Sequence, residues 1–176
     1  MRRSLKSIIA LIAGIAFIFS ASLTFAQQDK SKRPSPPAKA TQKVGNVTIT
    51  IDYSQPSVKG RTIGKDVEPM PGKVWRAGAN EPTVFQVDQD VKVEGKDLPK
   101  GKYGLYALMG EKDWTVIFSK KSEGWGTQYS EAEDFLRITV PDEKPAAFSE
   151  KLTYAIDAKG KVSLMWGDKQ FSFSVK

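Results

Sequence analysis

The chain has 176 residues, with 27 Lys and Arg, 20 Asp and Glu, and neither histidine nor cysteine. The lack of cysteine excludes thiol nucleophiles, disulfides and cysteine-ligated metal clusters. The lack of histidine excludes a Ser-His-Asp relay and imidazole acid–base catalysis near neutral pH. Any catalysis would therefore use Asp, Glu, Lys, Tyr or Ser.

The formal net charge of +7 arises at the N-terminus. Eight of the basic residues and one acidic residue lie in positions 1–43, which leaves 19 of each sign in residues 44–176. A neutral domain lacks the clustered positive surface that binding to a phosphate backbone requires. We therefore expect no nucleic-acid partner.

Residues 1–26 have the three-part pattern of a secretory signal peptide. A basic start precedes an apolar stretch over residues 8–19, and small side chains at Thr24 and Ala26 fit a peptidase site before Gln27. The alternative is an uncleaved membrane anchor, but the apolar core is shorter than the roughly 20 residues that span a bilayer. We expect an exported protein, periplasmic or extracellular, without stable membrane insertion after cleavage.

Residues 27–43 are rich in proline and lysine and carry almost no apolar side chains. Such a segment cannot bury enough surface to offset its ordering entropy, so we predict a disordered linker. The alternative function for this segment is a basic arm that touches anionic lipid or polysaccharide.

From residue 44 to residue 176 apolar and polar residues alternate, which is the period of a half-buried strand. Residues 102–109 are apolar on both faces, which indicates a central strand. The other strands are predicted around residues 47–54, 85–87, 91–93, 114–118, 136–140, 152–156, 162–166 and 171–175. With turn residues between these segments, the pattern predicts one all-β domain, an antiparallel β-sandwich or open barrel of about nine strands.

Two short motifs predict local structure. The run Leu98-Pro99-Lys100-Gly101-Lys102-Tyr103 is typical of a turn in which the tyrosine hydroxyl bonds to the backbone, as in a tyrosine corner. Further along, Ser130 and Glu133 have the spacing of a capping box, which predicts a helical turn over residues 130–134 with Ser130 as its cap.

Residues 52–81 break the alternation and hold the candidate site. The small residues Ala77-Gly78-Ala79 permit close approach of a ligand or of another strand. The candidate binding residues of this region are Asp52, Arg61, Lys73, Arg76, Asn80 and Glu81. Cations, an amide and carboxylates together suit a sugar, a carboxylate or a peptide terminus. The structural alternative is an Arg76–Glu81 or Arg61–Asp52 ion pair that closes a loop, with Trp75 in the core.

A second irregular segment, residues 119–129, holds Trp125 between two glycines. An aromatic side chain on a loop suits stacking on a sugar ring or closure over a ligand, so Trp125 joins the candidate binding residues. The alternative is a tryptophan that folds down and plugs one end of the sandwich.

Four strings in the sequence are distinctive: P-S-V-K-G-R-T-I-G, G-K-V-W-R-A-G-A-N-E-P-T, L-P-K-G-K-Y and W-T-V-I-F. They resemble an exported bacterial family catalogued as domain of unknown function 2911, and the resemblance covers residues 44–176. It implies a Gram-negative, Bacteroidetes-type host and a place in the periplasm or outside the cell, and it supplies no substrate. Residues 67–72 are less apolar than the family pattern, a difference that bears on any pocket formed there.

The chain contains no nucleophile-elbow, dinucleotide-binding or phosphate-loop motif, and we expect no cofactor, no metal and no assigned catalytic residue. Three functions remain. The sequence favours a non-catalytic ligand-binding module of the bacterial envelope, with a glycan, a peptide or a small anion as ligand. The alternatives are a structural or interaction protein of the envelope and, less favoured, a hydrolase that uses Glu81 or Asp52 as acid or base.

Overall fold

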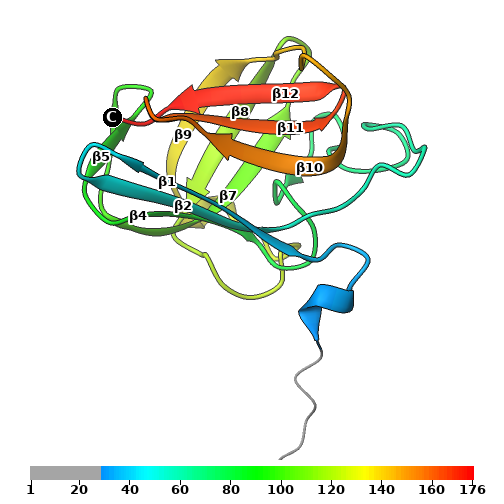
Figure 1. The fold of residues 1–176 in the computed structure, drawn as a ribbon, viewed down its shortest axis with the longest axis horizontal. Coiled ribbons are helices and arrows are strands. Elements are labelled where there is room, and N and C mark those ends of the chain that lie inside the picture. Colours follow the sequence, from blue (N-terminus) through cyan, green and yellow to red (C-terminus); the bar gives the residue numbers. More distant parts are fainter. Residues whose placement is uncertain (1–28) are drawn as a thin grey trace, which may run out of the picture. The chain divides into compact units, whose positions relative to one another are not determined.

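Two antiparallel sheets face each other across one apolar core (Figure 1). The computed structural model describes residues 29–176, and Ser31–Lys176 forms one compact unit. The signal peptide predicted over residues 1–26 and the first two residues of the predicted linker lie outside the described residues. Within residues 29–176, no helix has the length and apolar character to cross a membrane.

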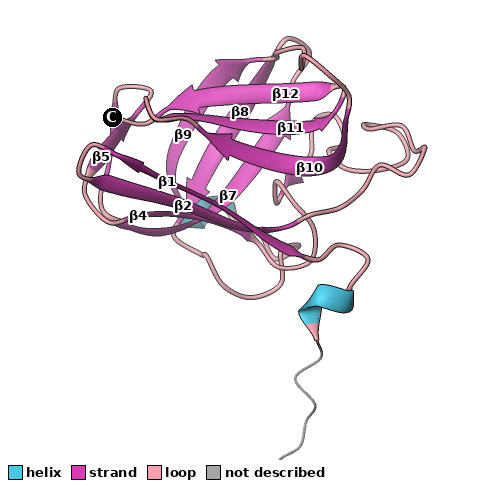
Figure 2. Cartoon of the chain, in the orientation of Figure 1, coloured by secondary structure: helices cyan, strands magenta, loops and turns pink. Residues whose placement is uncertain are grey.

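Strands make up nearly all of the regular structure, as Figure 2 shows. They are β1 (Pro37–Val44), β2 (Val47–Ser54), β3 (Val74–Trp75), β4 (Thr83–Val87), β5 (Val91–Val93), β6 (Lys96–Leu98), β7 (Gly101–Met109), β8 (Asp113–Ser119), β9 (Asp134–Pro141), β10 (Ser149–Ile156), β11 (Lys161–Gly167) and β12 (Lys169–Ser174). Two short 3-10 turns, η1 (Lys30–Lys32) and η2 (Glu131–Glu133), complete the part of the chain that the structure describes. The predicted all-β class is confirmed, and β1, β3 and β6 are additional to the predicted strands.

The larger sheet has the strand order β1-β2-β4-β7-β8-β9, and β3 pairs with β7 beyond the end of β4. The smaller sheet has the order β10-β11-β12, and β5 and β6 form a separate hairpin. The prediction that residues 102–109 form a central strand is confirmed, because β7 has neighbours on both sides. Figure 1 shows the smaller sheet lying across the larger one.

Crossover segments tie the two sheets together at both edges of the smaller sheet. After β2, the backbone of Pro56 and Val58 hydrogen-bonds to Leu152 and Glu150 of β10. After β9, Glu143 pairs with Gln170 of β12. These contacts cover edges that would otherwise be open to other chains. They also place the loop that follows residue 58 at one end of the sandwich.

The core consists of the inward-facing residues of both sheets. Its centre includes three aromatic rings, Phe85 of β4, Phe118 of β8 and Phe173 of β12, all essentially buried. The ring centroids of Phe85 and Phe118 lie 5.1 Å apart, and those of Phe118 and Phe173 lie 5.7 Å apart. Both pairs have the edge-to-face geometry that favours aromatic contacts. Apolar burial between the sheets therefore holds a domain that contains no disulfide.

The disordered linker predicted over residues 27–43 is wrong for residues 37–43. These residues belong to β1, which pairs in register with β2 from Pro37 opposite Ser54 to Val44 opposite Val47. Backbone hydrogen bonds to β2 and the packing of Ala38, Ala40 and Val44 against the core order this segment despite its polar composition. Because β1 is an edge strand, it tolerates a proline at its first position and exposed lysines along its length.

The two local motifs have different outcomes. The tyrosine corner is confirmed, because the Tyr103 hydroxyl donates a 2.8 Å hydrogen bond to the carbonyl oxygen of Pro99. The helical turn near residue 130 is confirmed as η2, but the predicted cap is wrong, because the Ser130 side chain makes no capping hydrogen bond. The Ser130 backbone carbonyl accepts from the Glu133 N–H instead, which closes the turn without the hydroxyl.

Replacing Tyr103 by Phe keeps the ring in the core and removes the donor for the Pro99 carbonyl. We expect the free energy of unfolding to fall by about 1 kcal/mol in urea denaturation. Thr41→Val is the control, because the Thr41 hydroxyl bonds to Thr50 on the exposed face of β1, where water replaces the lost partner. A Tyr103→Phe variant no less stable than Thr41→Val would show that the corner does not stabilise the fold.

Candidate functional site

A pocket of about 280 Å³ lies where the loop after β2 meets the turn after β3. We call it the Arg76 pocket. Its lining residues are Ser35, Pro56, Arg61, Val67, Glu68, Trp75, Arg76, Gly78, Ala79, Asn80 and Trp166. The pocket therefore brings together three of the predicted binding residues, Arg61, Arg76 and Asn80. The other four, Asp52, Lys73, Glu81 and Trp125, do not line it.

Two larger hollows are lined by neither a side-chain amide nor a tryptophan. One, of about 420 Å³, lies at the β5–β6 hairpin, where the ammonium of Lys92 and the carboxylate of Asp97 already pair with each other. The other, of about 470 Å³, lies beside Met109 and has a mainly apolar lining with the carboxylates of Glu111 and Asp113 at its margin. The Arg76 pocket combines charges of both signs with the side-chain amide of Asn80 and two tryptophans, which the other two linings lack.

The turn that carries Arg76 is built on the core. Trp75 is 2% exposed, and its indole N–H donates a 3.0 Å hydrogen bond to the Gly78 carbonyl, which confirms that Trp75 lies in the core. Ala77 has a φ of 49°, in the left-handed region, and its carbonyl accepts hydrogen bonds from the hydroxyls of Thr83 and Tyr154. A Cβ at Gly78 would lie 2.6 Å from the Thr83 hydroxyl oxygen. The small residues here let the turn press against the core.

The opposite wall of the pocket is the loop between β2 and β3. The backbone carbonyl of Glu68 accepts a 2.9 Å hydrogen bond from the indole N–H of Trp166, which ties this loop to the end of β11. One carboxylate oxygen of Glu68, Oε2, accepts a 2.9 Å bond from the Met70 N–H. Arg61 donates through Nε and Nη2 to the carbonyls of Val58 and Ser57, so it braces its own loop.

Arg76 is held without a polar partner. Its Nε atom is buried and has no hydrogen-bond partner, one of two such side-chain atoms within residues 29–176. In that part of the chain its guanidinium also makes no ion pair. Burial lowers the pKa of Arg76, while the charge on Glu68 and the hydroxyl of Tyr106 raise it again in part. A partly desolvated cation without an acceptor is costly, which is expected of a site that receives an anion.

The predicted ion pairs are replaced by others. The Arg76–Glu81 pair is wrong, because the Glu81 carboxylate accepts two bonds from Nη1 of Arg33, at 2.9 and 3.1 Å. The Arg61–Asp52 pair is also wrong, because Asp52 pairs with Lys39 at 2.8 Å. Both new partners come from the segment for which the sequence predicted a disordered linker. Neither carboxylate lines the Arg76 pocket, so neither of the acids considered for a hydrolase lies there.

The two remaining candidates lie at the surface. Lys73 is an exposed residue of the turn before β3. Trp125 is 52% exposed, so the prediction that it plugs the end of the sandwich is wrong. Its neighbour Gly126 makes the closer contact: its N–H donates to the Asn80 carbonyl at 3.2 Å, and a Cβ there would collide with Cδ of Arg76. The loop around Trp125 therefore packs on the Arg76 turn through Gly126.

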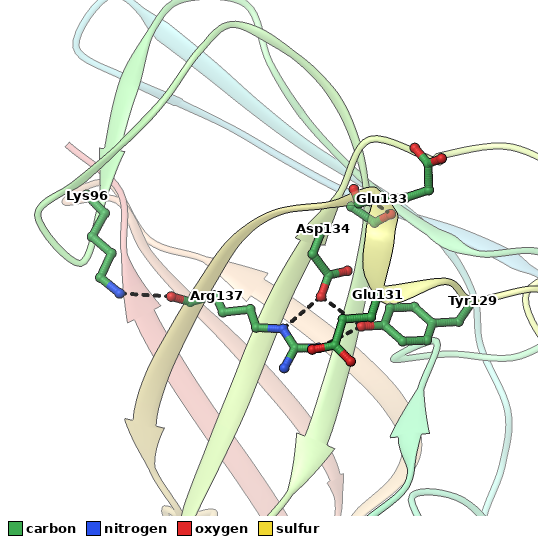
Figure 3. Close-up of polar contacts among 7 residues, drawn as sticks. Lys96, Tyr129, Glu131, Glu133, Asp134 and Arg137 are labelled. Atoms are coloured by element: carbon green, nitrogen blue, oxygen red, sulfur yellow. Dashed lines mark hydrogen bonds and ion pairs between the residues drawn. The ribbon is translucent and has the colours of Figure 1, made fainter.

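A polar cluster fastens the end of that loop to β9, and Figure 3 shows its side chains converging. The Tyr129 hydroxyl donates to Oδ2 of Asp134 at 2.8 Å, and Arg137 donates to the same oxygen at 2.7 Å and to the Tyr129 oxygen at 2.8 Å. Arg137 also pairs with Glu131 at 3.2 Å. The Tyr129 ring packs on Tyr106 with centroids 5.0 Å apart. Burial raises the pKa of Tyr106, and the positive charge of Arg76 lowers it again in part. The cluster thus anchors the loop beside the Arg76 turn.

Among the polar and aromatic residues that line the pocket, Ser35, Glu68 and Trp166 were not predicted from the sequence. Ser35 belongs to the segment predicted as a linker, and its carbonyl accepts a 3.0 Å bond from the Asn80 side chain. Trp166 has the alternation of an ordinary strand residue, which hides its contact with the pocket. Glu68 lies within residues 67–72, whose unusual polarity is the one sequence signal that pointed here.

Residues 35–175 match the family described as "Protein of unknown function (DUF2911)". The chain belongs to this family. The resemblance found in the sequence is confirmed, and the match begins before β1, so the first strand is part of the family's domain. Neither the search of curated proteins nor that of solved structures found a match. The family description states no activity.

Alkaline pH tests the loop anchor. Burial and the hydrogen bond to Asp134 raise the pKa of Tyr129 to about 12, whereas an unfolded tyrosine ionises at about pH 10. Above about pH 10 the folded state retains the Tyr129 proton while the unfolded state releases it. The stabilisation that the protonated Tyr129 hydroxyl provides is therefore complete below about pH 10 and is lost as pH rises towards about 12.

Tyr129→Phe removes this contribution. We expect the difference in unfolding free energy between wild type and variant to be constant below about pH 9 and to shrink between about pH 10 and 12. Denaturant titrations of both proteins across this range measure it, and the other tyrosines and the lysines cancel because both proteins contain them. A difference that does not change with pH would contradict the anchoring role of the hydroxyl.

Proposed function

We propose that this protein is a non-catalytic ligand-binding module of the bacterial envelope and that the Arg76 pocket binds a small ligand through an anionic group such as a carboxylate. One observation carries the proposal: the Nε atom of Arg76 is buried without a hydrogen-bond partner among residues 29–176. A guanidinium presents its donors in a fork that matches a carboxylate or a phosphate. Arg76 lines the pocket, and within residues 29–176 no part of its guanidinium has a hydrogen-bond or ion-pair partner, so a ligand anion there would supply the missing acceptor.

Neighbouring groups support the same ligand chemistry. Gly78 and Ala79 line the pocket, and within the described part of the chain their backbone N–H groups donate no hydrogen bond. Backbone N–H groups gathered in a turn favour anions. Arg61 adds a second positive charge to the lining. The volume of about 280 Å³ lies at the lower end of ligand pockets, which suits a small molecule or a terminal group.

The envelope location rests on the sequence. The basic, apolar and small-residue stretches of residues 1–26 have the pattern of an export signal. Binding is favoured over catalysis because Asp52 and Glu81, the acids considered for a hydrolase, are engaged in ion pairs outside the pocket lining.

Arg76→Met tests the proposal. The variant keeps the aliphatic stem and removes a partly buried charge, so we expect its thermal stability to be unchanged or raised, by up to about 1 kcal/mol in the free energy of unfolding. Stabilisation by small carboxylates and by phosphate, measured as a shift in Tm, should be present in wild type and absent in the variant.

Lys73→Met is the matched control, because Lys73 is an exposed cation outside the pocket lining. It should keep the full ligand-induced shift. An Arg76→Met protein that unfolds much more easily than wild type would indicate a structural arginine. Equal ligand shifts in Arg76→Met and wild type would rule out the pocket as the anion site.

A further inference from the structure

We infer that the ligand of the Arg76 pocket is a small zwitterion with the chemistry of an α-amino acid, whose carboxylate is bound by Arg76 and whose ammonium is bound by Glu68. This inference rests on the proposed function and adds the second charge. It comes from the two side chains of opposite sign that line one pocket and do not pair with each other.

Within residues 29–176, the Glu68 carboxylate has a free acceptor oxygen. Its Oε2 atom accepts the Met70 N–H, whereas no residue of the described part donates to Oε1 and none forms an ion pair with the carboxylate. Arg76 is close enough for its charge to interact with that of Glu68. An ion pair between them would satisfy both groups, and the structure shows none.

Glu68 and Arg76 are attached to the domain through separate contacts. The loop with Glu68 is tied to Trp166 through the Glu68 carbonyl and is closed by the bond from Met70. The stem of Arg76 is confined by Gly126, because that residue has no room for a Cβ next to Cδ of Arg76. These contacts fix the backbone of Glu68 and the stem of Arg76 independently of each other.

A zwitterion suits this arrangement better than a simple ion does. A plain anion would satisfy Arg76 but would come to lie near the negative charge of Glu68, and a plain amine would meet the reverse problem with Arg76 and Arg61. A ligand with both charges satisfies both sides of the pocket. Asn80 adds an acceptor for an ammonium, because its Nδ2 donates to Ser35 and, in residues 29–176, its Oδ1 has no partner.

The rest of the lining indicates a small, apolar side group. Both tryptophans use their indole N–H within the protein, Trp75 to Gly78 and Trp166 to Glu68, so they offer only carbon surface to a ligand. Val67 and Pro56 add further apolar surface. The volume of about 280 Å³ leaves room for an amino acid with a short side chain.

A series on one carbon skeleton tests the two charges separately. The probes are alanine as each enantiomer, lactate, propionate and ethylamine, and the measurement is the dissociation constant by isothermal titration calorimetry. With wild type, we expect one enantiomer of alanine to bind at least about tenfold more tightly than propionate, lactate to lie between them, and ethylamine to bind least.

Glu68→Gln should remove the preference for alanine over propionate and keep propionate binding, because glutamine can still accept the Met70 N–H through its amide oxygen. Glu123→Gln, at an exposed residue of the loop near Trp125, is the control and should keep the wild-type order. Arg76→Met should lose all the carboxylate probes.

The outcomes separate the inference from the proposed function. Propionate binding as tightly as alanine to wild type, with loss of both in Arg76→Met, would overturn the zwitterion and leave the anion site standing. A preference for alanine that persists in Glu68→Gln would also overturn it. Binding of none of the probes to wild type would count against both.

Discussion

The buried hydrogen bond between the Trp75 indole and the Gly78 carbonyl is the constraint on which the site depends. It folds the chain sharply at the end of β3, with Trp75 in the core and the next residue, Arg76, at the pocket. An indole N–H buried without an acceptor would be expensive, so the core itself enforces the turn. The rigid sandwich thus supplies the position of Arg76, and the cation need not contribute to folding.

Buried polar atoms without hydrogen-bond partners lower the free energy of unfolding, and Arg76 carries one of them. Two buried side-chain atoms in residues 29–176 have no hydrogen-bond partner, Nε of Arg76 and Oδ1 of Asp134. The charges of both residues shift the pKa of Tyr106, which Asp134 raises and Arg76 lowers. The loop anchored by Tyr129 contacts Asp134 at one end and packs on the Arg76 turn through Gly126. A core packed from two sheets tolerates such local costs, and they are typical of sites that bind something.

Side-chain periodicity is a local signal, and it predicted what depends on local pattern. The strands with alternating residues, the central β7 and the Tyr103 corner follow from it. β1 did not, because its inward face carries the small residues Ala38 and Ala40, which give a weak apolar signal, and its backbone bonds to β2 cannot be read from composition. Only part of the pocket could be predicted from the sequence. Arg76 and Asn80 were predicted because they lie where the alternation breaks. Glu68 and Ser35 were not, because tertiary contacts such as Trp166 to Glu68 and Asn80 to Ser35 bring them to the pocket.

The N-terminal segment shows how far the charge pattern alone can mislead. Formally, residues 44–176 are neutral and the surplus of positive charge precedes them. In the folded unit, however, Arg33 and Lys39 of that surplus pair with Glu81 and Asp52 of the domain. These half-exposed pairs add little stability individually, but they engage the two acids that the sequence suggested as partners of Arg76 and Arg61. Glu81 and Asp52 thus bind cations of the N-terminal segment, and Arg76 has no ion-pair partner within residues 29–176.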